Sequence, residues 1–332
     1  MRAAWYEEQG PAAEVLRVGE LPDPVPGPGE VRVRVAVSGV SPGDTKKRRG
    51  WLGSRMPSPV VIPHSDAAGV VDAVGEGVPD RRAGERVWVY GAQSYRPFGT
   101  AARYTVVPAD RAVPMPAPVA DDLGACLGIP GITAHRAVFA DGPVDGLTVL
   151  VHGVLGAVGS LAAQLAAWGG ATVLGTVVRT GDLPETDPAV TRRVVALDGA
   201  DPAGELRAYA PGGAVHRIVE VSLSDNGPLD AAVAGDGTVI AAYATRADPA
   251  PLPFWELLFK NVTLRLLGSD DFPPRARRQA ARELTSAAAS GALTVPVRER
   301  FPLDEIARAH DAVDAGGHGR IVLDVEPAPK RP

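Results

Sequence analysis

The stretch LTVLVHGVLGAVG, residues 147–159, decides the fold. It begins as a run of apolar strand-forming residues and passes through a glycine-rich loop into an Ala- and Leu-rich helical segment, residues 157–168. Glycines in such a loop let the main chain approach a pyrophosphate, and the following helix offers that anion free N–H groups and its positive dipole end. Strand, loop and helix together predict a dinucleotide-binding unit.

One position departs from the usual Gly-x-Gly-x-x-Gly fingerprint of this loop. Val154 stands where the first glycine is expected, and an extra Gly153 precedes it. In a chain rich in Gly and Ala such a pattern also arises by chance, and it is the flanking strand and helix that favour a cofactor site. The residues expected to contact the cofactor here are Gly153, Val154, Leu155, Gly156, Ala157, Val158 and Gly159.

The second strand of this unit indicates which dinucleotide is bound. The run 171–176 begins at the right distance after the helix, and its last residue, Thr176, should face the adenosine ribose. NAD sites place a carboxylate there, but no acidic residue occurs before Asp182. Arg179 can instead pair with a 2′-phosphate through a bidentate contact. We therefore predict NADPH, with Thr176 and Arg179 at the cofactor, although Arg179 as a solvated loop charge remains the alternative.

From Asp121 onward, helical stretches alternate with β-branched strands, which is typical of βαβ units. The predicted fold class is α/β, with a Rossmann doubly wound parallel sheet. Two prolines make a regular helix unfavourable within residues 181–188. The expected strands are residues 148–151, 171–176, 194–197, 216–221, 238–242 and 263–267, and the expected helices are residues 157–168, 229–234, 275–290 and 304–315.

The first part of the chain, residues 2–113, has short apolar runs separated by Pro and Gly, which predicts an irregular β-rich region. Residues 31–37 alternate with period two, as a half-buried strand should. The Pro-rich segment 21–28 suits a surface connection, because proline cannot join a sheet interior. Further strands are expected at residues 67–74, 86–90, 102–107 and 320–325.

Composition excludes several other classes of protein. The chain has 332 residues, of which 45% are hydrophobic and 22% charged, and its formal net charge of −5 gives no basic surface for nucleic acid. Cys126 is the only cysteine, which rules out an internal disulfide and a cysteine-built zinc site. The N-terminus carries no targeting pattern and no long apolar run occurs, so we expect a cytoplasmic protein with no membrane partner.

Several motifs are spaced in a consistent order along the whole chain. They are GVSPGD (39–44), IPHSDAAGVV (62–71), GERV (84–87), LGIPGITA (127–134), the loop 153–159 and GHGRIVL (317–323). With these motifs the chain resembles the zinc-free quinone oxidoreductase and zeta-crystallin branch of the medium-chain dehydrogenase/reductase superfamily.

This resemblance implies that the Rossmann sheet is inserted in a GroES-like, β-rich catalytic domain. The catalytic domain would comprise residues 1–118, completed by 292–332, and the NADPH-binding Rossmann domain residues 119–291. The family is commonly a homodimer joined through the edges of its Rossmann sheets. The resemblance also places Ser41, Thr133 and the segment around Ser269 near the nicotinamide, and it adds Tyr243 to the cofactor contacts.

Departures from the family pattern bear on the chemistry. Zinc alcohol dehydrogenases of the superfamily carry Cys at the position of Ser41 and His at the position of Ser65, and Cys126 falls a few residues before their third ligand. No metal ligand set survives, and we expect His64 to pack or hydrogen-bond in the wall of the site rather than bind a metal. Quinone reductases usually carry Asn where Ser41 stands, a tyrosine near Lys46 and a glycine near Tyr243, so the pocket shape is altered.

The predicted function is hydride transfer from NADPH to a quinone or similar conjugated carbonyl, driven by positioning and by hydrogen bonds to the developing oxyanion. Ser41, Gln93 and Tyr95 are the candidates for those hydrogen bonds, and Asp44 is expected to bind the chain's own backbone. Whether Tyr90 and Phe98 line the pocket or belong to the core stays open. The alternatives are an enoyl or alkenal double-bond reductase and, from another class, an NADPH-binding structural or RNA-binding protein.

Overall fold

The computed structural model describes residues 1–78 and 83–325 of the chain. The chain divides into two compact units. The β-rich unit comprises Met1–Pro130, Ala281–Ala289 and Thr294–Pro332, and the parallel-sheet unit comprises Gly131–Ala280 and Ser290–Leu293. This division lies at 130/131, later than the boundary at 118/119 expected from the sequence, and the assignment of independent domains stays a prediction.

The parallel-sheet unit is built on six strands in the order β10-β9-β8-β11-β12-β13, all of them parallel. Their bounds are β8 (Thr148–Val151), β9 (Thr172–Val177), β10 (Arg193–Ala196), β11 (Val215–Glu220), β12 (Ala234–Ala242) and β13 (Thr263–Leu266). The strand order reverses between β8 and β11. This is the switch point at which doubly wound sheets bind their ligands, so the predicted fold class is confirmed.

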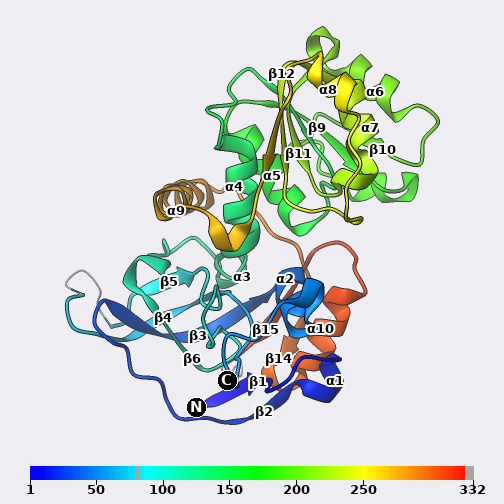
Figure 1. Cartoon of the computed structure of the whole chain (residues 1–332). Helices are drawn as coiled ribbons and strands as arrows, with labels where there is room; N and C mark the ends of the chain where they lie inside the picture. The colour runs from blue at the N-terminus through cyan, green and yellow to red at the C-terminus, as the bar shows by residue number, and fades with distance from the viewer. Residues whose placement is uncertain (79–82, 326–332) are drawn as a thin grey trace. The chain divides into compact units, whose positions relative to one another are not determined.

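Helices cover both faces of this sheet. The helix α4 (Ile132–Phe139) packs with α5 (Ala157–Trp168) on one face, and α6 (Pro202–Tyr209) packs with α7 (Leu223–Val233) on the other (Figure 1). The sheet strands bury β-branched and leucine side chains toward these helices, including Leu150, Leu174 and Ile218. The short α8 (Phe254–Leu258) precedes the edge strand β13.

The β-rich unit contains a mainly antiparallel sheet in the order β14-β15-β3-β4-β5-β7, with β6 paired to β3, and a separate β1-β2 ladder. Its strands are β1 (Arg2–Trp5), β2 (Arg17–Glu20), β3 (Glu30–Val40), β4 (Asp66–Val74), β5 (Arg86–Val89), β6 (Tyr104–Pro108), β7 (Ala112–Pro114), β14 (Val297–Pro302) and β15 (Arg320–Asp324). The alternation predicted for residues 31–37 is confirmed in β3, where Val31, Val33 and Val35 are fully buried.

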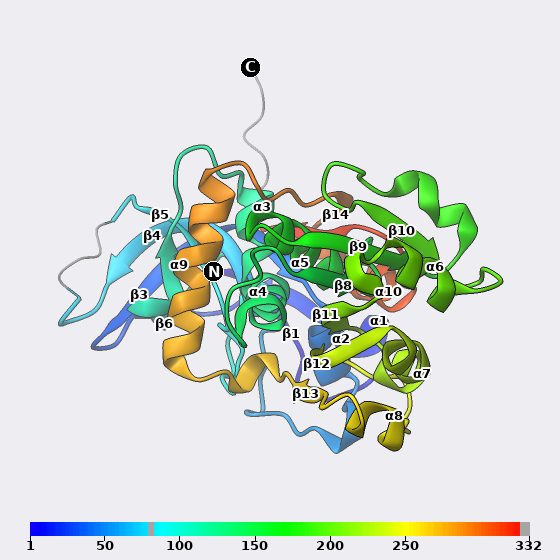
Figure 2. The same ribbon diagram turned by 90° about the horizontal axis from the view of Figure 1, so that it is seen from above.

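Short helices complete the architecture of the chain and are labelled again in the view from above (Figure 2). They are α1 (Ala12–Val15), α2 (Pro42–Arg48), α3 (Asp121–Gly124) and α10 (Ile306–Asp314), and the longer α9 (Pro274–Ala289) contributes its residues 281–289 to the β-rich unit. Among the described residues, no helix has the length and apolar character needed to cross a membrane.

Two expectations about helices have different outcomes. The segment after β9 forms a 3₁₀ stretch, Thr180–Glu185, and no α-helix, as the prolines predicted. In contrast, α7 begins at Leu223 rather than at residue 229. Gly227 and Pro228 weaken the sequence pattern there, and Pro228, the sixth of the eleven residues of α7, removes one backbone N–H donor from the middle of the helix, which nevertheless continues to Val233.

Candidate functional site

The glycine loop between β8 and α5 has the geometry of an anion-binding turn. Gly153 adopts a left-handed conformation with φ of 66°, and Gly156 is the N-cap of α5. A Cβ atom on Gly159 would lie 2.1 Å from the carbonyl oxygen of Gly153. Only glycine fits at that contact, so the first turn of α5 stays close to the loop with its N–H groups directed outward.

The structure explains why Val154 can replace the expected first glycine. Its side chain is buried, and its N–H donates to the carbonyl oxygen of Thr176 at 3.1 Å. A Cβ on Gly175, in the neighbouring strand β9, would lie 2.5 Å from Cγ1 of Val154. The space that the Val154 side chain needs is therefore left by Gly175 in the neighbouring strand. Gly175 is the residue of the sequence that could have indicated this compensation.

Arg179 lies just beyond β9, on the loop predicted to meet the 2′-phosphate. Its side chain is exposed, and it forms no ion pair with any residue of 1–78 or 83–325. Its backbone N–H donates to Asp182 Oδ2 at 3.2 Å, and Thr180 donates to Asp198 through both its N–H and its hydroxyl. The two acidic side chains thus hold the loop backbone and leave the Arg179 guanidinium available.

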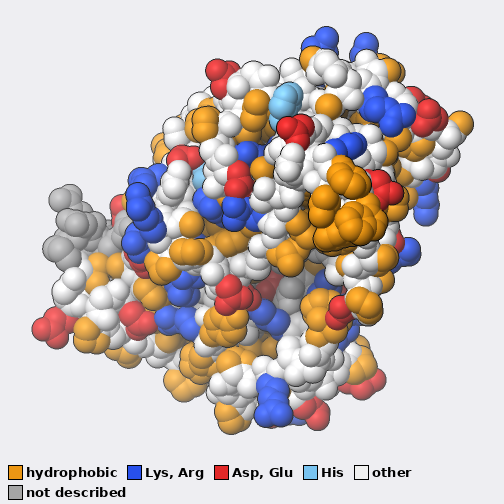
Figure 3. Space-filling model, turned by 45° about the horizontal axis from the view of Figure 1, so that its top comes forward, with side chains coloured by type: hydrophobic (Ala, Val, Ile, Leu, Met, Phe, Trp, Pro, Cys, Tyr) orange, Lys and Arg blue, Asp and Glu red, His pale blue; other side chains and the backbone are white. Residues whose placement is uncertain are grey.

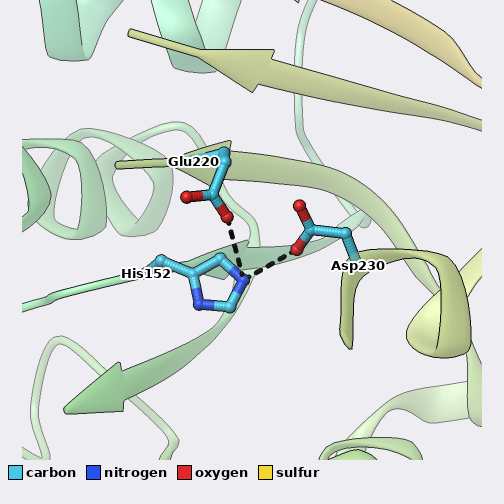
Figure 4. Close-up of side chains that lie close together, drawn as sticks. All are labelled: His152, Glu220 and Asp230. Carbon is cyan, nitrogen blue, oxygen red and sulfur yellow. Dashed lines mark hydrogen bonds and ion pairs between the residues drawn. The ribbon is translucent and has the colours of Figure 1, made fainter. Parts of the chain in front are cut away.

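A cluster of buried polar side chains lies next to the loop, where sequence reasoning had predicted only a contact from Thr176. Figure 4 shows three of its members, His152, Glu220 and Asp230. His152 Nε2 donates to Asp230 Oδ1 at 2.8 Å and lies 3.5 Å from Glu220 Oε2. His152 Nδ1 meets the Thr176 hydroxyl at 2.9 Å. All four side chains are fully buried. We call His152, Thr176, Glu220 and Asp230 the His152 cluster.

Burial and charge shift the proton affinities within the His152 cluster. Burial raises the pKa of Glu220 to about 7, with the charge of Asp230 acting in the same direction and that of His152 opposing it. Burial alone would lower the pKa of His152, but the hydrogen bond to Asp230 and the nearby negative charges raise it above its ordinary value. An imidazolium paired with the Asp230 carboxylate is the state that this arrangement favours.

Three further predicted cofactor contacts also belong to the parallel-sheet unit. Thr133 is buried in the first turn of α4, Tyr243 follows β12, and Ser269 begins a 3₁₀ turn, Ser269–Asp271. The N–H of Tyr243 donates to the carbonyl oxygen of Glu220 at 3.0 Å, which joins Tyr243 to the end of β11. Burial, with the charge of Glu220, raises the pKa of the Tyr243 phenol.

Ser41 is the N-cap of α2 in the β-rich unit and is buried. Its N–H donates to Asp44 Oδ2 at 2.8 Å, so Asp44 binds the chain's own backbone as predicted. The Ser41 hydroxyl accepts from Arg320 Nη2 at 3.2 Å, and Arg320 Nε donates to the Cys126 sulfur at 3.4 Å. Sequence reasoning missed Arg320. Its buried guanidinium joins Ser41 and Cys126, the two residues whose positions were compared with those of zinc ligands in the sequence.

His64 takes part in a chain of buried hydrogen bonds, which confirms that it hydrogen-bonds. Arg48 Nε, which can only donate, meets His310 Nδ1 at 3.3 Å, and the two Nε2 atoms of His310 and His64 are 2.9 Å apart. His64 Nδ1 then meets Ser38 Oγ at 3.0 Å. The chain ends through Ser38 and Thr100 at the carbonyl oxygen of Asp66, which can only accept.

We expect this buried pair to make stability depend on pH. Burial lowers the pKa of His64 to about 3 and also lowers that of His310, whereas unfolded histidines titrate near 6.5. The unfolded chain therefore gains protons first as pH falls, and the stability present above pH 6.5 is lost progressively toward pH 3. Urea unfolding should show a loss of about 2–4 kcal/mol between pH 7 and pH 5.

The variant His64→Asn supplies the comparison for this prediction. It removes one titrating group and keeps an amide that can donate to Ser38. The pH dependence of the free energy of unfolding that this pair contributes should therefore be about half as steep in the variant as in the parent chain. Equal steepness in the variant and the parent chain would contradict the assignment.

The loop that carries Gln93 and Tyr95, the other two predicted hydrogen-bond donors, contains both buried and exposed side chains. Gln93 is buried, whereas Tyr95 is 74% exposed and has a positive φ of 55°. Tyr90 is a core residue whose hydroxyl donates to the carbonyl oxygen of Asp110 at 3.2 Å, and Phe98 is exposed. The structure thus settles one of the open alternatives, since Tyr90 belongs to the core.

Comparison with known proteins gives two family matches, the first within the β-rich unit and the second extending over parts of both units. Residues 27–117 match the alcohol dehydrogenase GroES-like domain, and residues 203–323 match the zinc-binding dehydrogenase family. The chain belongs to the medium-chain dehydrogenase/reductase superfamily. Its GroES-like region and its parallel, nucleotide-binding type of sheet are both accounted for by that membership.

Individual relatives place this superfamily member near the quinone oxidoreductases. The human quinone oxidoreductase is 28% identical over 336 residues, covering 96% of this chain and 95% of the relative. A mycobacterial protein solved in complex with NADPH is 28% identical, with a TM-score of 0.83 and coverage of 97% and 99%. An NAD-dependent alcohol dehydrogenase is 24% identical with a TM-score of 0.87, over 98% and 100% of the two chains, which shows the fold alone.

Proposed function

We propose that this chain is an NADPH-dependent, zinc-independent oxidoreductase that transfers hydride to a quinone. The observation that carries the proposal is the glycine loop followed, at the end of β9, by an exposed Arg179 and no carboxylate in the strand. The quinone oxidoreductase relatives and the neighbour solved with NADPH support the same reading. Oxidoreductase chemistry agrees with the superfamily, and the quinone is the hydride acceptor that we propose.

The residues present fit NADPH. The close contact at Gly159, which a Cβ would fill, brings the N-terminus of α5 to the loop, and Gly153–Gly159 would hold the pyrophosphate. Arg179 would pair with the 2′-phosphate, and Thr133, Thr176, Tyr243 and Ser269 remain the other proposed contacts. When bound, NADPH supplies the hydride, and the protein supplies its position and surroundings.

The residues around Ser41, where relatives of the zinc type bind their metal, do not fit zinc, although one matching family is named for it. Ser41 and Ser65 stand where relatives of the zinc type carry ligands, and a hydroxyl is a poor zinc donor beside Cys or His. The Arg320 guanidinium contacts both Ser41 and Cys126. A permanent positive charge at this place would repel a divalent cation, so we derive no step through a metal.

Ser41 is the best placed of the three candidate donors to the developing oxyanion. Its oxygen already accepts an N–H from Arg320, which leaves its own proton to donate and makes that proton more acidic. Gln93 and Tyr95 remain proposed donors from the loop of the β-rich unit. Each would stabilise negative charge on the acceptor oxygen as the hydride arrives.

Turnover of NADPH with a panel of quinones and of α,β-unsaturated ketones tests the function. We expect oxidation of NADPH with quinones and a lower rate in the variant Ser41→Ala. Preference for the unsaturated ketones would favour the double-bond reductase instead. Binding of NADPH that protects against heat, without turnover of any panel member, would favour an NADPH-binding structural or RNA-binding role.

We also propose a homodimer formed through the edge of the parallel sheet. Phe254, Trp255 and Phe259 are each more than 60% exposed, and Leu266 on the edge strand β13 is 71% exposed. Figure 3 shows adjoining hydrophobic side chains on this part of the molecule. Exposed aromatic residues beside an unpaired strand edge are typical of an interface, because both gain from being covered.

The variant Trp255→Glu should therefore convert a dimer into monomers, as measured by sedimentation equilibrium. Trp51→Glu, at an exposed tryptophan of the β-rich unit, is the matched control and should leave the oligomeric state unchanged. A parent chain that sediments as a monomer would overturn the proposed dimer. For location we propose the cytoplasm, since the one cysteine is buried and free.

A further inference from the structure

The His152 cluster occupies the switch point of the parallel sheet. His152 directly follows β8, Glu220 ends β11, and these two strands are the neighbours at which the strand order reverses. Figure 4 shows the imidazole edge turned toward both carboxylates, with Asp230 reaching in from α7. The cluster therefore lies inside the protein directly behind the glycine loop.

A continuous set of hydrogen bonds joins the cluster to the loop. Asp230 holds Nε2 of His152, and Nδ1 of the same ring meets the hydroxyl of Thr176. That hydroxyl oxygen also accepts the N–H of Gly153 at 3.3 Å. Since Gly153 is the first residue of the loop, the orientation of its peptide depends on the ring and the hydroxyl behind it.

The charges in the cluster do not balance when both carboxylates are ionised. An imidazolium at His152 and a carboxylate at Asp230 neutralise each other, and Glu220 then adds one uncompensated negative charge in a fully buried place. Glu220 Oε1 accepts from Ser222 N–H and from Asn226 Nδ2, but within the described part of the chain Oε2 has no hydrogen-bond donor. Such a charge is costly, and a proton on Glu220 removes it.

We propose that His152 is a positioning residue that orients the Gly153 N–H through Thr176, and that NADPH binding is coupled to the uptake of one proton by Glu220. The phosphates of NADPH are anions, and they bind more tightly when the site behind the loop carries no net negative charge. By reciprocity, the bound phosphates favour the protonated form of Glu220. This inference rests on the proposed function, because it requires NADPH at the loop.

Every group that faces Glu220 acts consistently with this coupling. His152 after β8 is the neighbouring cation, Asp230 and Asn226 come from α7, and the Tyr243 phenol after β12 is neutral because its pKa is raised. The titration of Glu220, with its pKa of about 7, therefore changes the net charge of the cluster near neutral pH. Affinity for NADPH should decrease as pH rises through that value.

The experiment is calorimetric titration of the full chain with NADPH in buffers of different ionisation enthalpy, across pH 6 to 8.5. Relative to Glu220→Gln, the parent chain should take up about half an additional proton per NADPH at pH 7 to 8, because Glu220 with its pKa of about 7 is already partly protonated there. Its Kd should rise about five- to twentyfold more over this range. The comparison cancels titration of the 2′-phosphate, which both proteins share. Glu205→Gln, at an exposed position on α6, should behave as the parent chain.

The positioning role has its own test in Thr176. Thr176→Val removes the hydroxyl and should raise the Kd for NADPH about fivefold at every pH, whereas Thr176→Ser keeps the hydroxyl and should restore binding. Equal Kd values for Val and Ser would overturn the positioning role.

The remaining outcomes separate this inference from the proposed function. Equal proton uptake by the parent chain and Glu220→Gln, with NADPH bound in both, would overturn the coupling alone. If Glu220→Gln does not fold, the parent chain is titrated with NADH, which lacks the 2′-phosphate, and no proton uptake would overturn the coupling. Absence of any NADPH binding would overturn the proposed function and this inference together.

Discussion

Replacing Arg179 by alanine raises the Kd for NADPH about 10- to 50-fold and leaves the Kd for NADH nearly unchanged. The guanidinium is exposed and without an ion-pair partner among the residues described, so its loss costs the folded protein little. A charge-assisted contact to a phosphate contributes about 1.5–3 kcal/mol, which corresponds to this range of affinity. Fluorescence titration with the two cofactors measures the change directly.

The control for this prediction is Arg207→Ala, at an exposed arginine of α6 whose guanidinium donates to the carbonyl oxygen of Ala232. It should leave both Kd values as they are. A loss of NADH and NADPH binding by the same factor in Arg179→Ala would instead mean that Arg179 holds the loop rather than the 2′-phosphate. Its backbone bond to Asp182 is the contact that such a result would implicate.

The substitution Gly159→Ala should damage the loop itself. The added Cβ would lie 2.1 Å from the Gly153 oxygen and 2.8 Å from its carbonyl carbon, and both are backbone atoms that a rotamer change cannot move. Separating the loop from α5 should lower the free energy of unfolding by at least about 2 kcal/mol. It should also weaken NADPH binding by about tenfold or more, because the N–H groups that meet the pyrophosphate are displaced.

Gly181→Ala provides the matched comparison, since a Cβ there meets no atom within 4 Å and the backbone has no positive φ. Urea unfolding and NADPH titration of this variant should give parent values. If Gly159→Ala proved as stable as Gly181→Ala, the close contact of α5 with the loop would be wrong.

The local part of the site was readable from the sequence, because strand, glycine loop and helix follow one another directly. The bounds of α5 are those predicted, and Arg179 was identified from its place after β9. The replacement of a glycine by Val154 was recognised, but its compensation by Gly175 needed the register of two neighbouring strands.

Pairs that are distant in sequence could not be predicted in the same way. Asp230 and Glu220 meet His152 only because β11 and α7 fold back beside β8. No local sequence pattern predicts that contact. A glutamate within the apolar strand run around Ile218 was the only available signal. Arg320 was missed for the same reason, since its partners Ser41 and Cys126 are brought to β15 by the sheet and by α3.

The hydrogen bonds from Arg48 to Asp66 have a consequence for motion. With both histidines neutral, the donor at one end and the acceptor at the other allow a single arrangement of protons, in which His310 and His64 carry different tautomers. No ring can flip and no hydroxyl can rotate alone without breaking two bonds at once. We therefore expect His64 and His310 to reorient only together and slowly, as one cooperative element.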